Sequence, residues 1–119
     1  MSNITETLES LLTIDGAMAA SLVDSSTGMM LGAVGSGIDL EVAAAGNTEV
    51  VRAKLRTLKS LGLSDAIDDM LITLTTQFHI IRPLASNPEV FMYLVLDKNR
   101  ANLALARIKA KTAEAALVL

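Results

Sequence analysis

The chain of 119 residues contains no cysteine and a single histidine, His79. Without thiols it can form no disulfide, no thiolate metal site and no cysteine nucleophile. A catalytic triad or a histidine metal site would need partners that the composition does not supply around His79. We therefore interpret His79 as a structural or solvent-edge residue of a strand. The lack of cysteine is typical of a reducing compartment, and we expect a cytoplasmic protein.

Aromatic residues are scarce as well. Phe78, Phe91 and Tyr93 are the only three, whereas apolar residues make up 51% of the chain. The core must therefore be built from Leu, Ile, Val, Ala and Met. A chain of this length can bury such a core without a disulfide or a metal, so we predict one domain over residues 1–119.

The net charge of −3 argues against a broad basic surface, so we expect no nucleic-acid partner. No apolar run approaches the roughly 20 residues of a membrane helix, so we expect no direct membrane insertion. The start "MSNITETLES" has no cationic segment followed by an apolar one, and we expect no signal peptide. The mean hydropathy is nevertheless positive. That surplus of apolar surface is usually resolved by oligomerisation.

Helical and strand periodicities follow one another along the chain. A first helix follows a cap at Ser2 or Asn3, and a long helix has Asp39 as its cap and ends at Gly62. Asn99 is the expected cap of the last helix. Strands are predicted over residues 17–24, 29–34, 69–76, 78–84 and 89–97. The order α-β-β-α-β-β-β-α predicts an α+β fold, a five-stranded antiparallel sheet sandwiched by helices.

Strict alternation assigns the side chains of the first strand to two faces. One face is expected to carry Met18, Ala20 and Leu22. The other is expected to carry mostly small side chains, which let a helix approach closely: Ala17, Ala19, Ser21 and Val23.

The stretch "VDSSTGMMLGAVGSG", residues 23–37, raises the question of a phosphate or nucleophile site. A P-loop needs a lysine after its second glycine, but isoleucine follows here. A dinucleotide fingerprint would need a further glycine three residues on, where the chain has leucine, and the G-x-S-x-G spacing of a hydrolase elbow is absent. Glycine, aspartate and serine dominate tight turns for conformational reasons. We therefore predict a hairpin turn in which Gly28 takes a positive φ and Asp24 and Ser25 hydrogen-bond the turn backbone.

Two charged groups remain to be interpreted. One acidic group lacks the length and the terminal glutamate of an EF-hand loop, so we predict a solvated loop and no metal site at Asp65, Asp68 and Asp69. The second half of the long helix is basic, which indicates either a solvated face or a docking stripe for an acidic partner: Arg52, Lys54, Arg56 and Lys59. No nucleophile, base and metal ligand converge in the pattern. We predict no enzyme, no catalytic residue and no bound cofactor.

Four segments in this order resemble the roadblock (dynein light-chain) family, most closely its bacterial members related to MglB and to the B components of actinobacterial conservons. "IDGAMAASLVDSSTGMML" resembles the family's G-x-x-A-x-x-V-D-x-x-G hairpin, and a long alanine-rich helix follows from Glu41. "LGLSDAIDDMLITLTTQFHIIRPL" resembles its glycine-led hydrophobic strand and the strand that ends in x-x-P-hydrophobic. "VFMYLVLDKNRANLALARIKAKTAEAAL" is similar to its last strand, polar turn and helix. The resemblance implies a roadblock/profilin-like fold, with the second helix on one sheet face and the terminal helices on the other.

The resemblance also implies a homodimer in which the third strands pair across a two-fold axis and the second helices lie side by side. Two features of the sequence agree with this expectation. The third strand would leave unpaired backbone at a sheet edge, and the long helix carries more apolar residues than one buried stripe needs. The implied interface comprises Val50, Val51, Leu55, Leu58, Met70, Leu71, Ile72, Thr73 and Leu74.

The resemblance implies a non-catalytic role, as a scaffold or regulator of a bacterial small Ras-like GTPase, including regulation of its GTP hydrolysis. Arg52 and Arg56 are the first residues to test for partner binding, because of their charge and expected exposure. The alternative is a small-ligand sensor module of a signalling complex. That alternative predicts a closed apolar pocket between helix and sheet.

Overall fold

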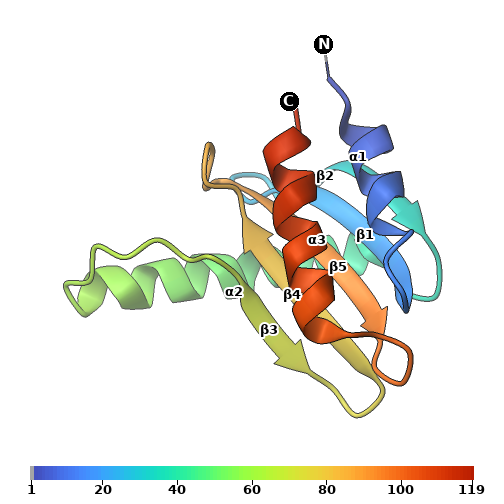
Figure 1. The fold of residues 1–119 in the computed structure, drawn as a ribbon. Coiled ribbons are helices and arrows are strands. Elements are labelled where there is room, and N and C mark those ends of the chain that lie inside the picture. The colour runs from blue at the N-terminus through green and yellow to red at the C-terminus, as the bar shows by residue number, and fades with distance from the viewer. Residues whose placement is uncertain (1) are drawn as a thin grey trace.

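The computed structural model describes residues 2–119 and has the predicted order of elements. The helices are α1 (Ile4–Leu11), α2 (Leu40–Ser60) and α3 (Leu103–Ala116). The strands are β1 (Ala17–Asp24), β2 (Met29–Gly35), β3 (Met70–Thr73), β4 (Gln77–Pro83) and β5 (Val90–Asp97). Figure 1 shows a single sheet with α1 and α3 on one face and α2 on the other.

The sheet is antiparallel throughout, in the order β2-β1-β5-β4-β3. The expected α+β sandwich is therefore confirmed. β5 lies in the middle, and every residue from Val90 to Leu96 is buried. β2 and β3 form the two edges of the sheet.

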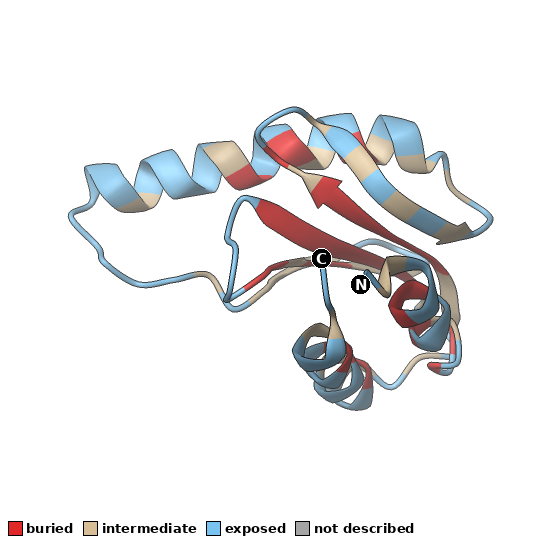
Figure 2. Ribbon diagram, turned by 90° about the horizontal axis from the view of Figure 1, so that it is seen from above, coloured by how far each residue is buried: buried red, intermediate tan, exposed pale blue. Residues whose placement is uncertain are grey.

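Each face of the sheet has its own hydrophobic core, and β5 contributes to both. Met92, Leu94 and Leu96 face α1 and α3, where Leu8, Leu11, Ala106 and Ala110 are buried. Phe91, Tyr93 and Val95 face α2, where Ala44 and Val51 are buried. Figure 2 shows these layers from above, with α2 on one side of the sheet and the terminal helices on the other. The alternation of apolar side chains along one strand thus holds three layers together.

The assignment of β1 side chains to faces is partly wrong. Ala20 and Leu22 lie in the core under α1 and α3, as expected, but Met18 packs on the α2 side and Ala17 on the other. The pairing of β1 with β5 shifts register between Ala17 and Ala19. Such an irregularity breaks the two-residue period, so side chains before it change face.

Several predicted strand bounds differ from the structure by one residue, and two larger differences have a hydrogen-bonding cause. β3 ends at Thr73, because the Leu74 amide donates to the Gln77 carbonyl at 2.8 Å and closes the β3–β4 hairpin. α3 is capped by Asn102, whose side-chain oxygen accepts from the Leu105 amide at 3.1 Å. Asn99 instead lies in the preceding turn, where its amide donates to the Asp97 carboxylate. The caps of the long helix are as predicted, with Asp39 accepting from two amides of the first turn.

Candidate interaction surface

The second half of α2 lies beyond the hydrophobic core. Its buried side chains are Ala44, Thr48 and Val51, and no residue of 52–60 is buried. This last part of the helix spans about 13 Å, and Figure 1 shows it extending past the sheet. Leu55 and Leu58 continue the stripe of Ala44, Thr48 and Val51 at helical spacing, yet Leu55 is 40% exposed. The apolar stripe therefore continues past the end of its own core, onto a part of the helix that is open to solvent.

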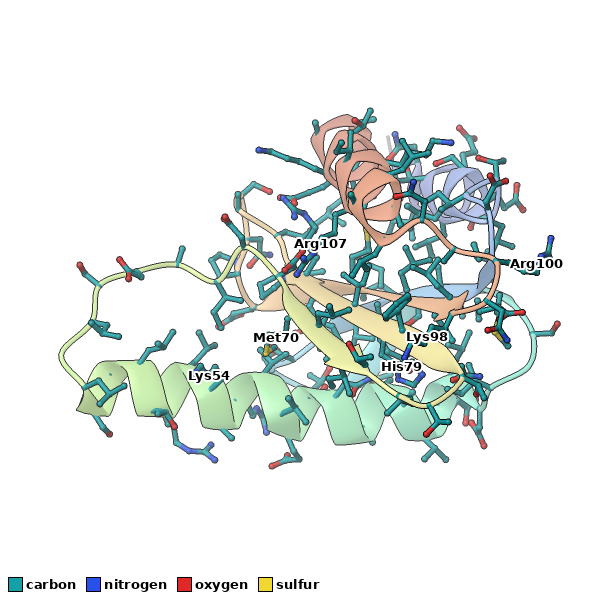
Figure 3. The ribbon with its side chains drawn as sticks, turned by 60° about the horizontal axis from the view of Figure 1, so that its bottom comes forward. Lys54, Met70, His79, Lys98, Arg100 and Arg107 are labelled. Carbon is teal, nitrogen blue, oxygen red and sulfur yellow. The ribbon has the colours of Figure 1, made fainter. Side chains whose placement is uncertain are left out.

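The edge strand β3 begins where the overhanging part of the helix, residues 52–60, leaves the sheet (Figure 3). Met70 and Ile72 pack on the α2 side of the sheet, and Leu71 packs on the opposite side, toward α3. β3 pairs only with β4 among the described residues, so its outer row of backbone groups has no neighbouring strand in residues 2–119. We call this region the α2–β3 surface and define it by Val50, Leu55, Leu58, Met70, Ile72 and Thr73.

Two residues expected at a dimer interface are placed differently by the structure. Val51 is fully buried in the core between α2 and the sheet, so it is not available to another chain. Leu74 is exposed, but it lies in the β3–β4 turn and not in the edge strand. The helical period alone does not show where the sheet beneath α2 ends, and Val51 lies just inside that limit.

The two arginines proposed for partner binding differ in their surroundings. The Arg52 guanidinium donates to the Ser26 carbonyl at 2.9 Å and lies 3.6 Å from the Glu49 carboxylate. Arg52 therefore holds the β1–β2 turn to α2. Arg56 is exposed on the overhanging part of the helix, as are Lys54 and Lys59.

His79 belongs to a chain of hydrogen-bonded side chains between the sheet and α2. Its Nε2 lies 2.8 Å from the Gln77 side-chain oxygen, and its Nδ1 lies 2.9 Å from the Tyr93 hydroxyl. Since the Gln77 oxygen only accepts, Nε2 donates and Nδ1 accepts from Tyr93. Burial lowers the pKa of His79, and burial also raises the pKa of Tyr93, partly offset by a hydrogen bond with Asn47. The neutral imidazole is therefore the form that fits this site.

His79 has a structural role, as expected, but the sequence did not predict its hydrogen-bond partners, Gln77 and Tyr93. Figure 3 shows His79 and Met70 on the side of the sheet that faces α2. A signal was present, because Gln77 and His79 are two apart in a strand and so share a face. Tyr93 comes from the neighbouring strand, and the sequence does not state which strands are neighbours.

The stretch of residues 23–37 contains the hairpin turn of residues 25–28, which joins β1 to β2. Gly28 has φ +78°, and the Asp24 carboxylate accepts from the Ser26 amide and hydroxyl. These hydrogen bonds lower the pKa of Asp24. Ser25 does not bond its own turn, because its hydroxyl and amide both donate to the Glu89 carbonyl. The polar residues of this stretch thus serve the turn and its attachment to the β4–β5 loop.

Two ion pairs join α3 to the sheet and to the residue before β3. Arg107 donates two hydrogen bonds to the Asp69 carboxylate, at 2.9 and 3.0 Å, and Figure 3 shows Arg107 on the α3 side of the sheet. Arg82 of β4 pairs with Glu114. Asp69, from the acidic group, thus helps to hold α3 on the sheet. Within residues 2–119, no three His, Asp or Glu side chains gather as metal ligands would, and no helix has the length and apolar character to cross a bilayer.

Comparison with solved structures identifies the fold. MglB from Myxococcus xanthus matches with a TM-score of 0.83 at 20% identity, over 94% of this chain and 82% of that one. The gliding protein MglB from Thermus thermophilus matches with a TM-score of 0.80 at 22% identity, over 94% and 83%. The roadblock/LC7 domain from Streptomyces avermitilis matches with a TM-score of 0.82 at 11% identity, over 97% and 94%. The chain has a roadblock fold.

At these identities the likeness is one of fold. No family model matches the sequence, and no curated protein sequence matches it. In this roadblock fold α2 lies alone on one face of the sheet, as the resemblance implied. In the same arrangement the overhanging part of α2 extends beyond the start of the edge strand β3.

Proposed function

We propose that this chain is a non-catalytic homodimeric scaffold or regulator that binds a bacterial small Ras-like GTPase. The observation that carries the proposal is the α2–β3 surface. There, an apolar helical stripe leaves its own core beside an edge strand.

A symmetric dimer would satisfy both parts of this surface at once. Pairing of β3 with its own copy supplies hydrogen-bond partners to the outer backbone groups. The same two-fold axis brings the overhanging helices together, so that Leu55 and Leu58 of each chain become covered. Removing that apolar surface from water favours association.

The choice of a GTPase as partner rests on the resemblance to the roadblock family together with the fold. Arg56 is the better of the two candidate contact residues, because Arg52 is already engaged by Ser26 and Glu49. Arg56 also lies on the overhanging part of α2, close to the proposed two-fold axis. A GTPase bound there would contact both chains.

The side chains of the described residues support a binding role over a catalytic one. His79 has only Tyr93 and Gln77 as hydrogen-bond partners, and its imidazole lies under α2. Asp69 and Glu114 are held in ion pairs with arginines. The alternative of a ligand sensor is not favoured, because Val23, Ala44 and Val51 fill the space between β1 and α2.

The proposal is tested with the purified full chain and purified bacterial Ras-like GTPases loaded with GDP or with a non-hydrolysable GTP analogue. We expect a complex on size-exclusion chromatography that contains two copies of this chain and forms with one nucleotide state preferentially. Arg56→Glu should weaken the complex by about tenfold, whereas Lys109→Glu on the exposed side of α3 should leave it intact. Absence of a complex with every GTPase tested, from a chain shown to be folded, would contradict the proposal.

A further inference from the structure

The opposite edge of the sheet carries a second surface. β2 (Met29–Gly35) is paired with β1 on one side, and no strand of residues 2–119 lies on its other side. Natural edge strands are usually protected by charged residues, proline or bulges. β2 has no charged residue and no proline, and its pairing with β1 has one irregularity, at Leu31. Its exposed side chains are apolar, with Met29 67% and Leu31 44% exposed. An uncharged, apolar edge of seven residues suits strand addition by another chain.

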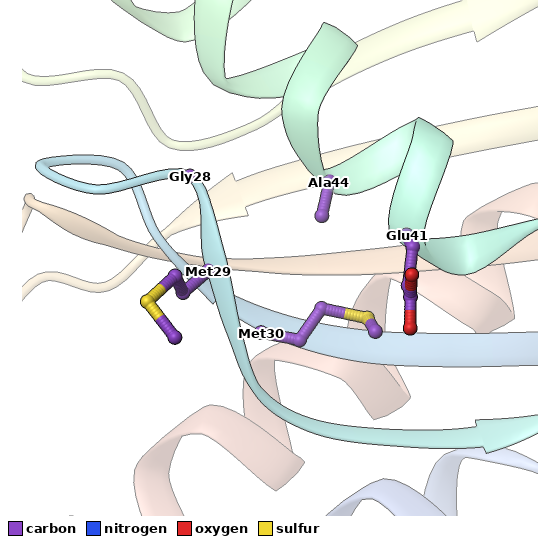
Figure 4. A pocket seen from close by; sticks show the side chains of 5 residues that line it. All are labelled: Gly28, Met29, Met30, Glu41 and Ala44. Carbon is purple, nitrogen blue, oxygen red and sulfur yellow. The ribbon is translucent and has the colours of Figure 1, made fainter.

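A hollow adjoins this edge on each face of the sheet. On the α2 face, a hollow of about 420 Å³ lies between the start of β2 and the first turns of α2; it is lined by Gly28, Met29, Met30, Glu41 and Ala44. Figure 4 shows the Met30 side chain extending toward Glu41. On the α1 face, a hollow of about 310 Å³ is lined by Ser2, Asn3, Ile4, Thr5, Glu6 and Leu31. Each hollow therefore contains one glutamate.

The part of the chain that forms β2 and its neighbours α1 and β1 carries acidic side chains and no basic ones. Residues 1–51 contain no lysine or arginine, and all ten basic side chains of the protein come later in the sequence. This first part of the chain forms α1, β1, β2 and the first half of α2. The first basic residue after this part of the chain is Arg52, which pairs with Glu49 and donates a hydrogen bond to the Ser26 carbonyl. Seven carboxylates lie in this part: Glu6, Glu9, Asp15, Asp24, Asp39, Glu41 and Glu49.

We propose that β2 binds an extended, basic and apolar segment of a partner protein by strand addition. Backbone hydrogen bonds to β2 supply the docking frame, and successive side chains of the added strand point to opposite faces of the sheet. Lysine or arginine side chains of the partner then enter the two hollows in alternation. On the α2 face the aliphatic stem lies along Met30 and the charge reaches Glu41, and on the α1 face the charge reaches Glu6.

A second copy of this chain fits the same edge poorly. Two β2 edges brought together would place two acidic halves side by side, and like charges at an interface oppose association. A basic segment is attracted to both glutamates. The β2 site also lies at the opposite margin of the sheet from β3. It remains accessible whether or not the α2–β3 surface is occupied.

A synthetic peptide, acetyl-Val-Arg-Val-Val-Arg-Val-amide, tests the proposal on the full chain. Its two arginines fall on opposite faces of a strand, one for each hollow. We expect amide signals of β2 to shift on titration in NMR spectra, and the outer β2 amides to exchange more slowly. The same peptide with glutamate in place of arginine should not bind. A version of the peptide that is N-methylated at the two central valines should lose binding. The N–H groups of adjacent residues point to opposite edges of a strand, so whichever edge of the peptide faces β2, one N–H donor is missing.

Two double variants with the same change in net charge separate the site from general electrostatics. Glu6→Gln/Glu41→Gln should weaken peptide binding by about tenfold. Asp65→Asn/Asp68→Asn, in the loop after α2, should bind as the unaltered chain does.

Three results would overturn the proposal. The arginine peptide could fail to bind, or the glutamate or N-methylated peptide could bind as tightly. The two double variants could lose affinity equally, in which case only the overall charge matters. Finally, the chain without peptide could form assemblies larger than a dimer, and Met29→Lys could abolish them. That result would mean that the β2 edge binds a second copy of this chain. None of these results depends on whether the chain binds a GTPase.

Discussion

Ser21 lies in the middle of β1, fully buried, and its hydroxyl is the buried side-chain group of residues 2–119 that lacks a hydrogen-bond partner. Burying an unpaired hydroxyl costs free energy, since its hydrogen bonds to water are lost without replacement. We expect Ser21→Ala to raise the free energy of unfolding by about 1 kcal/mol. Urea denaturation measures the change.

Ser25 provides the matched control for this substitution. It is also buried, but its hydroxyl donates to the Glu89 carbonyl at 2.6 Å. Ser25→Ala should therefore lower the free energy of unfolding by about 1 kcal/mol. If both variants were destabilised equally, the Ser21 hydroxyl would have a partner that the structure does not show.

His79 makes the stability of the chain depend on pH. Burial lowers its pKa in the folded state, whereas in the unfolded chain the pKa is about 6.5. Below that value the unfolded chain takes up a proton more readily than the folded chain does. Stability is therefore fully retained above pH about 6.5 and is lost as the pH falls toward the folded-state pKa. We expect the melting temperature to fall between pH 7.5 and 5.5, and to fall less for His79→Gln.

The comparison of the two chains isolates the imidazole, because the carboxylates titrate in both. Circular dichroism at pH 7.5 checks that His79→Gln is folded. Parallel loss of stability in the two chains over this pH range would contradict the assignment of the effect to His79.

At the scale of elements, α2 contains a glycine, Gly46, that neither a positive φ nor a close neighbour in this chain requires. A Cβ at Gly46 would have no atom within 4 Å, and the residue is exposed. Glycine in a helix interior costs stability relative to alanine, because it loses more backbone freedom on folding. We expect Gly46→Ala to raise the free energy of unfolding by about 0.5 to 1 kcal/mol, as measured by urea denaturation.

Gly35 at the end of β2 is the opposite case. Its φ is +89°, and a Cβ there would lie 2.3 Å from the Met18 carbonyl oxygen and 2.6 Å from the Ala19 Cα. Both neighbours are backbone atoms that cannot turn aside. Gly35→Ala should therefore lower the free energy of unfolding by at least about 2 kcal/mol. A neutral result would mean that the β1–β2 pairing near Gly35 is looser than described.

The elements were predictable where their signals are local. Asp39 is followed by a regular apolar period, and it caps α2 as expected. The end of β3 was not predictable, because the apolar and β-branched run continues to Thr76 while the hairpin closes earlier, through Gln77 of the next strand. Asn99 and Asn102 are equally good caps by type. The turn that Asp97 makes with Asn99 decides between them.

At the scale of the whole molecule, the proposed dimer depends on the overhanging part of α2. Leu55→Lys/Leu58→Lys places two charges on the stripe that the partner would cover. We expect the unaltered chain to sediment at micromolar concentration with twice the 12.5 kDa mass of one chain. The double variant should raise the dissociation constant by at least about a hundredfold, because two central apolar contacts are lost and two charges would be buried.

Ile108→Lys on α3 is the control for this experiment. Ile108 is 63% exposed on the other side of the sheet, so the same kind of substitution there should leave the mass unchanged. A monomeric unaltered chain would remove the basis for the proposed dimer. A dimer that both variants dissociate equally would move the interface away from the α2–β3 surface.

The sequence by itself determined the order of elements, the long helix with its N-cap, the hairpin turn within residues 23–37 and the surplus of apolar surface. These follow from short-range physics, since periodicity, capping and turn chemistry act over a few residues. The tertiary structure decided which strands are neighbours, and hence that Tyr93 meets His79 and that Ser25 bonds Glu89. It also decided that Val51 lies inside the core while Leu55, one turn later, lies outside. Where a sheet ends beneath a helix depends on strand order and register, which join residues far apart in the chain.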